Sequence, residues 1–258
     1  MILNDKSKVI IIGASSGIGK SLAIHYANLN IKVGIAARRE DKLNEIKSLY
    51  PSNIYSKKID ITSQDAFSLL SELIDEMGGI DMLIFASGVG HSNKKLDIKI
   101  EQEIIEVNNK GFLNIIIPTF HYFTNKSKTD KRLKKIVVLS SVASIKGLGA
   151  SPAYSASKRF MTTYCESLQQ IALWNNSNIK FTLILPGFID TDFIKGHNYP
   201  FTMPLDYAVK KIIKAIKKNK FRAIIDWKWS IIVFIWSHFP LKFWESKRIA
   251  KLILDNKK

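Results

Sequence analysis

The chain has 258 residues, 46% of them hydrophobic, which is enough for a substantial core in one α/β domain. Its single cysteine, Cys165, excludes an internal disulfide; with no signal-peptide pattern and no apolar run of roughly 20 residues, we expect a cytosolic protein without a membrane-spanning helix. Most of the net charge of +17 lies in the tail, because the residues from 201 onward include 14 Lys and Arg but only 4 acidic residues. This uneven distribution disfavours nucleic-acid binding.

Short apolar runs alternate with longer helical patterns along the chain, as in repeated βα units that form a parallel sheet. We predict a Rossmann-type, doubly wound α/β fold: a mostly seven-stranded parallel sheet with helices on both faces, plus a C-terminal helical extension. The expected strands are 8–13, 32–37, 54–60, 81–87, 135–140, 179–185 and 222–225. The expected helices are 17–29, 40–49, 64–77, 100–124, 152–174 and 206–219.

No internal repeat, low-complexity linker or composition break marks a second domain. Residues 1–225 are expected to form a single Rossmann-type catalytic domain, and residues 226–258 a basic, aromatic extension of it. Because ligands of a doubly wound sheet bind beyond the carboxyl ends of the strands, the residues that follow the strands are the candidates for a site.

The stretch GASSGIG joins the first expected strand to the first expected helix and contains Gly13, Gly17 and Gly19. Glycine lets the backbone turn tightly and approach a ligand, and the helix start offers free N–H groups to a phosphate. The spacing G-x-x-x-G-x-G differs from the usual dinucleotide fingerprint, and a purely structural turn is the alternative. The βαβ context favours a nucleotide site.

The second expected strand ends in AARRED, where proteins that bind NAD commonly place an acid on the adenosine ribose. Here Arg38 and Arg39 follow the strand instead. Two guanidinium groups can hold a 2′-phosphate that an acid would repel, although they could simply form a basic helix start. We predict NADP(H) as the cofactor, in preference to NAD(H).

The stretch SPAYSASKRFMTTY is typical of a helix, with Ser151 as its N-cap and Pro152 in its first turn. Tyr154 and Lys158 are four residues apart and therefore share one face. We expect the ammonium to favour the phenolate and to lower the pKa of Tyr154 from about 10, which would suit an acid–base group. A simple surface contact between the two side chains is the alternative.

Taken in order, these motifs and four others resemble those of the classical short-chain dehydrogenase/reductase family. GASSGIG is similar to the cofactor turn, and KIDIT places Asp60 at the family's adenine contact. EVNNKG is similar to the segment of the active-site asparagine, here Asn108, and VVLSSVAS places Ser141 the usual 13 residues before the tyrosine. LPGFIDT is similar to the proline–glycine turn whose threonine, here Thr191, contacts the nicotinamide amide.

The resemblance covers roughly residues 7 to 225 and implies hydride transfer between NADP(H) and an alcohol/carbonyl pair. The implied catalytic residues are Asn108, Ser141, Tyr154 and Lys158. In this scheme Tyr154 is the acid–base group and Ser141 binds the substrate oxygen. Lys158 binds the nicotinamide ribose, and Asn108 holds a water that relays protons. The implied cofactor contacts are Gly13, Ser15, Ser16, Gly17, Ile18, Gly19, Arg38, Arg39, Asp60, Ala86, Gly88, Tyr154, Lys158, Pro186, Gly187, Ile189 and Thr191.

Two departures from the family pattern concern polar groups that brace the central strands. Ile12 stands where threonine is usual, and Phe85, Ala86, Ser87 and Gly88 replace the asparagine-rich turn after the fourth strand. We expect the backbone turn to survive because its glycine remains. No metal is expected, since the five histidines lack metal-ligand spacing.

Substrate selection is expected to depend on residues 88–96, 142–150 and 192–205. The last segment is rich in aromatic residues and should act as a mobile lid over the nicotinamide, which favours a hydrophobic alcohol or carbonyl substrate. The alternative is that these aromatic residues only pack against the body of the protein.

The tail after residue 225 combines tryptophans with lysines, and Pro240 is expected to divide it into two helical pieces. Residues 227–254 resemble an interfacial segment that could lie on anionic lipid, whereas packing on the protein body or on another subunit is the alternative. The resemblance also implies a homodimer or homotetramer. Two other functions stay open: a non-catalytic NADP(H)-binding sensor, and a membrane-surface-associated binding protein that uses the basic tail.

Overall fold

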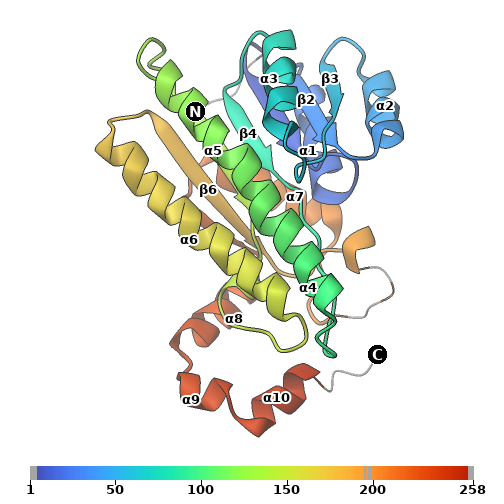
Figure 1. The fold of residues 1–258 in the computed structure, drawn as a ribbon, viewed down its shortest axis with the longest axis vertical. Coiled ribbons are helices and arrows are strands. Elements are labelled where there is room, and N and C mark those ends of the chain that lie inside the picture. Colours follow the sequence, from blue (N-terminus) through green and yellow to red (C-terminus); the bar gives the residue numbers. More distant parts are fainter. Residues whose placement is uncertain (1–4, 195, 197–198, 255–258) are drawn as a thin grey trace.

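A single parallel sheet of seven strands organises the protein, in the order β3-β2-β1-β4-β5-β6-β7 (Figure 1). The computed structural model describes residues 5–194, 196 and 199–254. The ends of the expected domain and extension (1–4 and 255–258) and Lys195, His197 and Asn198 of the expected lid lie outside the described residues. The strands are β1 (Lys8–Ile12), β2 (Lys32–Ala37), β3 (Ile54–Lys58), β4 (Met82–Phe85), β5 (Lys134–Leu139), β6 (Ile179–Pro186) and β7 (Arg222–Ile225). The predicted doubly wound fold is confirmed.

Helices cover both faces of the sheet because its central strands are apolar on both sides. The helices of the main body are α1 (Gly17–Ala27), α2 (Glu40–Leu49), α3 (Ala66–Glu76), α4 (Ile98–Ile105), α5 (Gly111–Lys126), α6 (Pro152–Trp174) and α7 (Leu205–Lys217). Side chains of α3, α5 and α6 share one buried cluster with the sheet, and those of α1, α2 and α7 share the other. Figure 1 shows α5 and α6 crossing one face of the sheet side by side.

The expectation of one helix over residues 100–124 is corrected by the structure. The structure contains α4, then a π-helical turn at Glu106–Lys110, and then α5. A π-helical turn takes more residues than an α-helical one, so it changes which side chains face the sheet. Hydrophobic periodicity alone does not predict that change. As a result, Asn108 is fully buried on the side of α6.

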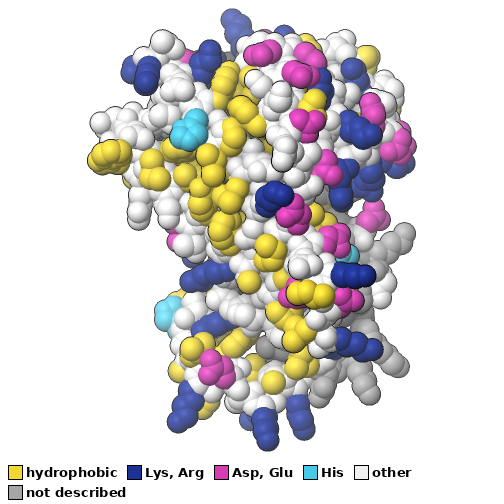
Figure 2. Space-filling model, viewed as in Figure 1, with side chains coloured by type: hydrophobic (Ala, Val, Ile, Leu, Met, Phe, Trp, Pro, Cys, Tyr) yellow, Lys and Arg dark blue, Asp and Glu magenta, His cyan; other side chains and the backbone are white. Residues whose placement is uncertain are grey.

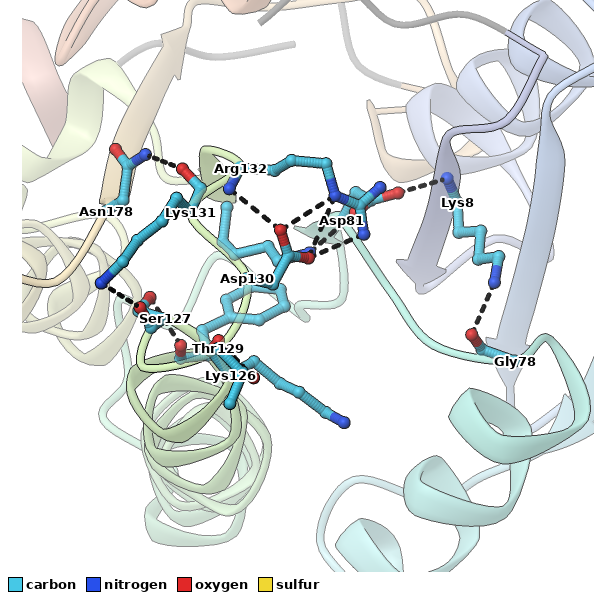
Figure 3. Close-up of polar contacts among 12 residues, drawn as sticks. Lys8, Gly78, Asp81, Lys126, Ser127, Thr129, Asp130, Lys131, Arg132 and Asn178 are labelled. Atoms are coloured by element: carbon cyan, nitrogen blue, oxygen red, sulfur yellow. Dashed lines mark hydrogen bonds and ion pairs between the residues drawn. The ribbon is translucent and has the colours of Figure 1, made fainter.

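A charged network joins the amino ends of β1, β4 and β5 (Figure 3). The expected site lies at the opposite, carboxyl ends of the strands. Lys134 is nearly buried, and its Nζ lies 2.8 Å from Asp81 Oδ1 and 3.0 Å from Asp130 Oδ2. Asp81 Oδ2 accepts a hydrogen bond from the Lys8 backbone N–H at 3.1 Å. Arg132 Nη2 lies 2.7 Å from Asp130 Oδ2 and completes the network. The buried charge of Lys134 is thus compensated by two carboxylates.

The chain ends in an arm, residues 226–254, that lies below the main body in Figure 1. Within the described residues it forms three helices, α8 (Trp227–His238), α9 (Leu241–Trp244) and α10 (Lys247–Leu254). The expectation of two pieces was wrong: Pro240 separates α8 from α9, and a second break follows Trp244. Across the described chain, no helix is both long and apolar enough to cross a bilayer.

The network at the amino ends of the strands predicts a pH-dependent stability. Hydrogen bonds from Arg132, which outweigh partial burial, and the charge of Lys134 hold the pKa of Asp130 well below its usual range. The carboxylate therefore stabilises the fold above about pH 4, and this contribution is lost as pH falls further. Asp130→Asn should lower the free energy of unfolding by about 1 kcal/mol at pH 7, measured by urea denaturation.

The deficit of the Asp130→Asn protein should shrink as the pH is lowered from 4 toward the folded-state pKa of Asp130. Asp75→Asn, which alters an exposed carboxylate on α3 outside the network, is the matched control and should change little. A deficit of the same size at neutral and acidic pH would contradict the assignment.

Candidate active site

The turn between β1 and α1 can be built only with glycine at its key positions. Gly13 has φ +88°, and a Cβ there would lie 2.6 Å from the backbone nitrogen of Ser87. Gly17 has φ +53°, and a Cβ on Gly19 would collide with the carbonyl oxygen of Gly13. Ser16 is the N-cap residue of α1, but its side chain accepts no hydrogen bond from the first N–H groups of the helix. This cradle fits a phosphate group.

The guanidinium group of Arg39 is hydrogen-bonded to the hydroxyl groups of Ser15 and Ser16 in this turn. Its Nη2 donates to Ser15 Oγ at 2.9 Å and to Ser16 Oγ at 2.7 Å, and its Nε donates to Ser15 Oγ at 3.2 Å. Because Arg39 follows β2 and the serines follow β1, these hydrogen bonds join the ends of two adjacent strands. An exposed guanidinium held in one place beside the glycine turn fits an additional phosphate on a dinucleotide.

Asp60 braces the turn after β3 and lies near the exposed Arg38. Its Oδ1 accepts hydrogen bonds from Thr62 N at 2.9 Å and Thr62 Oγ1 at 2.8 Å. Although burial opposes ionisation, these hydrogen bonds and the charge of Arg38 keep the pKa of Asp60 below its usual value. The carboxylate is therefore an ionised acceptor on the same side of the sheet as the glycine turn.

Tyr154 and Lys158 occupy successive turns of α6, as the sequence predicts. Ser151 is the N-cap residue but does not cap with its side chain; Glu101 Oε2 instead accepts a hydrogen bond from the Ala153 N–H at 2.9 Å. Lys158 Nζ lies 5.7 Å from the centre of the Tyr154 ring. Tyr154 is partly buried and Lys158 almost fully buried, which excludes a simple contact on the surface.

The buried ammonium of Lys158 is held by the end of β5. Its Nζ donates to the Leu139 carbonyl oxygen at 3.2 Å. Burial lowers the pKa of Lys158 to about 8. A Cβ on Gly88 would lie 3.0 Å from this Nζ, so the turn after β4 passes close to the ammonium.

Ser141 lies beside Tyr154, at the point where β5 ends. Its backbone is extended, and its Oγ accepts a hydrogen bond from Ala143 N at 3.1 Å. Burial raises the pKa of Tyr154, and a side-chain hydrogen bond with Ser141 only partly offsets this. The net shift is upward, opposite to our expectation from the sequence. The reason is that burial penalises the phenolate while the Lys158 ammonium bonds to a carbonyl group.

Asn108 is buried next to this group and anchors the segment after β4. Its Oδ1 accepts from Val89 N, and its Nδ2 donates to Val89 O, both at 2.8 Å. Its Nδ2 also donates to Ser157 Oγ on α6 at 3.0 Å. A Cβ on Gly88 would lie 3.2 Å from Asn108 Oδ1. The side chain thus fixes the backbone that passes between it and Lys158.

Apolar packing replaces the missing polar braces of the central strands. Ile12 and Phe85 are fully buried and face each other in the register of β1 and β4. The backbone hydrogen bond from Ala86 N to Ile12 O is intact at 2.8 Å, and Phe85 packs edge-on against Phe112 at 5.4 Å. The backbone pairing of β4 with β1 thus extends to Ala86, while the family-like turn after it stays a prediction.

The segment after β6 forms the opposite wall of the site. Pro186 ends β6, and a Cβ on Gly187 would overlap the indole of Trp229 from α8. Thr191 lies across from the glycine turn, since its Cγ2 would be 3.6 Å from a Cβ on Gly17. Ile189 is buried and bridges to Met203, which closes the described part of the expected lid onto this wall.

Three residues near Tyr154 or the turn after β6 were not singled out in the sequence, although two of them lie in the expected substrate-selecting segments 88–96 and 192–205. Phe193 lies 6.0 Å from the Tyr154 ring, centre to centre, and a Cβ on Gly90 would lie 2.5 Å from that ring. Trp229 packs on Gly187 and lies 5.5 Å from Phe188. The glycine at position 90, two residues after Gly88, was a usable signal. The contacts of Phe193 and Trp229 depend on tertiary structure and have no local signature.

Comparison with known proteins points to one family. A sequence model of the family described as short chain dehydrogenase matches residues 7–199. An "uncharacterized oxidoreductase" of Myxococcus xanthus is 28% identical over 233 residues, which cover 86% of this chain and 88% of that protein. In the part of the chain that the structure describes, no group of three or more His, Cys, Asp or Glu side chains could hold a metal ion.

Two solved structures share the fold. A short chain dehydrogenase from Burkholderia cenocepacia in complex with NADP superposes with a TM-score of 0.78 at 19% identity, covering 94% of this chain and 98% of that one. A short chain dehydrogenase/reductase from Burkholderia phymatum in complex with NAD gives a TM-score of 0.80 at 16% identity, covering 91% and 94%. Proteins of this fold thus occur in complexes with either nicotinamide cofactor.

The glycine turn yields a direct test of the site. Gly13→Ala should reduce the affinity for nicotinamide cofactors by at least about tenfold, because the added methyl group meets the backbone at Ser87 and the positive φ is strained for alanine. Fluorescence titration measures the affinity. Gly147→Ala is the matched control, since a Cβ there meets nothing within 4 Å. Equal affinities of the two variants would contradict a cofactor site at this turn.

Proposed function

This chain belongs to the short-chain dehydrogenase family, and on that premise we propose that it is an NADP(H)-dependent oxidoreductase acting on a hydrophobic alcohol/carbonyl pair. The observation that carries the proposal is the grouping of Ser141, Tyr154 and Lys158 at the carboxyl end of β5, on the same edge of the sheet as the glycine turn. A nicotinamide cofactor, when bound, would supply or accept the hydride.

The residues that would bind the cofactor follow the carboxyl ends of β1, β2 and β6. The glycine turn and the start of α1 would hold the diphosphate. Arg39, fixed by Ser15 and Ser16, and Arg38 beside Asp60 would take the 2′-phosphate, which favours NADP(H) over NAD(H). The backbone at Pro186–Gly187, with Thr191 across from Gly17, would hold the nicotinamide end.

In the proposed reaction, Tyr154 gives its proton to the carbonyl oxygen during reduction and takes it back during oxidation. Ser141 would hold the same oxygen by a hydrogen bond. Lys158 is mostly protonated at pH 7, since its pKa is about 8, and its charge, 5.7 Å from the centre of the Tyr154 ring, would offset part of the cost that burial adds to the phenolate. Asn108 would be a positioning residue through its contacts with Val89, and in the proposed relay it would hold the water.

Aromatic groups around Tyr154 support a hydrophobic substrate. Phe193 and the backbone at Gly90 lie against its ring, and Phe188 stacks on Tyr199 at 4.0 Å between ring centres. A groove of about 600 Å³ runs between residues 144–149, the start of α6 and Leu241 of the arm. An apolar molecule would be desolvated more readily than a charged one beside these aromatic rings.

We also propose a cytoplasmic homodimer or homotetramer that does not bind nucleic acid. Exposed apolar side chains on α4, among them Ile98 and Ile105, line a groove of about 990 Å³ with Pro152, Ala153 and Ala156 of α6. Burial of such a face against a second copy of the chain would be favourable.

The role of Tyr154 is tested by Tyr154→Phe, which removes only the hydroxyl group. Turnover of an aldehyde and ketone panel should fall by about 10²- to 10⁴-fold, because the developing alkoxide loses its proton donor. Affinity for NADPH should stay within about twofold, since the phenol is not needed for the phosphate contacts. Tyr164→Phe, on the same helix, is the control. Preserved turnover in Tyr154→Phe would favour a non-catalytic NADP(H)-binding sensor instead.

The cofactor preference is tested by replacing Arg38 and Arg39 together with alanine. Affinity for NADPH should drop at least about tenfold more than affinity for NADH, because only NADPH carries the 2′-phosphate. Titration of both cofactors by fluorescence measures the difference, and Arg248→Ala on α10 controls for the loss of positive charge. Equal losses for the two cofactors would exclude the phosphate clamp.

A further inference from the structure

Helix α8 of the arm carries large apolar side chains on two opposite sides, yet only one of these sides is covered. The inner side carries Trp229 and Val233, which are buried, and Trp236, which is partly buried. Trp229 lies 6.4 Å from Trp236 between ring centres, and its Nε1 donates to the Phe201 carbonyl at 3.4 Å. This side anchors the arm to the body of the protein.

The outer side of α8 is exposed. Trp227, Ile231, Phe234 and Ile235, spaced to share one helix face, expose between 52% and 66% of their surfaces. The following helix α9 adds Leu241 and Phe243, which are exposed by 60% and 59%. Large apolar side chains that gather on one element, unlike those scattered singly, mark a surface that binds something.

Positive charge accompanies this apolar face. Between residues 226 and 254 the chain has five Lys and Arg and two acids. All five basic side chains are exposed, and three of them belong to α10. Figure 2 shows Lys and Arg side chains projecting from the lower end of the molecule, over the arm, with apolar side chains between them. Exposed Trp and Phe next to Lys and Arg are the combination that suits the interface of an anionic membrane.

We propose that the outer face of the arm, formed by α8, α9 and α10, docks on an anionic lipid bilayer. Charge complementarity selects this occupant: a second copy of the arm would bring another excess of positive charge to the same face and repel it. The apolar side chains of α8 and α9 would enter the headgroup region, and the basic side chains would contact lipid phosphates. The docking does not depend on the proposed reaction.

The position of the arm gives this docking a structural link to the site. Lys146 Nζ donates to the Phe239 carbonyl at 3.1 Å, and Trp244 Nε1 donates to the Gly147 carbonyl at 3.0 Å. Both contacts reach the segment that follows Ser141. A membrane under the arm would therefore lie beside residues 146–147, which line the groove between the arm and the start of α6.

The experiment is sedimentation of the full-length protein with vesicles. Binding is expected with vesicles of phosphatidylglycerol and phosphatidylcholine in equal parts, weaker binding with phosphatidylcholine alone, and partial release at about 0.5 M salt. Phe234→Ser/Ile235→Ser should lower the bound-to-free ratio by at least about tenfold, because two apolar side chains are lost from the interface. Lys242→Glu/Lys247→Glu should lower it to a similar extent.

Two control variants match these changes at the far end of the molecule. Leu173→Ser/Trp174→Ser removes exposed apolar groups from the end of α6, and Lys126→Glu/Lys128→Glu reverses charges near the end of α5. Both should bind vesicles like the original protein. The proposal is overturned if the original protein stays in the supernatant with anionic vesicles, or if the controls lose as much binding as the arm variants. It is also overturned if light scattering shows a dimer that Phe234→Ser/Ile235→Ser dissociates, since the face would then bind a second copy.

Discussion

Lys158 brings a positive charge into a nearly closed space, and no carboxylate among the described residues forms an ion pair with it. Its ammonium donates to the Leu139 carbonyl, and burial reduces its pKa to about 8. The surrounding groups leave little freedom: Gly88 lacks the side chain that would fill the gap between the ammonium and Asn108. Because a buried cation is costly in free energy, β5, the turn after β4 and the π-helical turn must all keep their positions around it.

The polar braces that the family places between its central strands are apolar in this chain, and the sheet is unaffected. Ile12 and Phe85 are fully buried at these positions, and the backbone hydrogen bond from Ala86 to Ile12 keeps the register of β1 and β4. Tight packing around Phe112 replaces directional bonds. Two different kinds of interaction can therefore hold the cofactor edge of this sheet in one geometry.

The parallel sheet could be predicted from the sequence because apolar runs and glycine turns are local signals, whereas the order of its strands depends on tertiary pairing and was not predicted. The pairing of Tyr154 with Lys158 on one helix face was likewise predictable from spacing, whereas Ser141 was expected beside them only from the resemblance to the family. The π-helical turn, the contact of Phe193 with Tyr154 and the packing of Trp229 on Gly187 were not, because each depends on residues far apart in the chain. The direction of the pKa shift of Tyr154 was also missed, since it depends on burial rather than on spacing.

Trp229 takes the space that any side chain at position 187 would need, so the wall of the site and the first turn of α8 are in effect one rigid piece. The indole cannot move inward, and a displacement outward would leave a void beside Phe188. A tail that follows the main domain in the sequence thus contributes to the wall of the candidate site. Removing it would uncover the backbone at Gly187 and not merely shorten the chain.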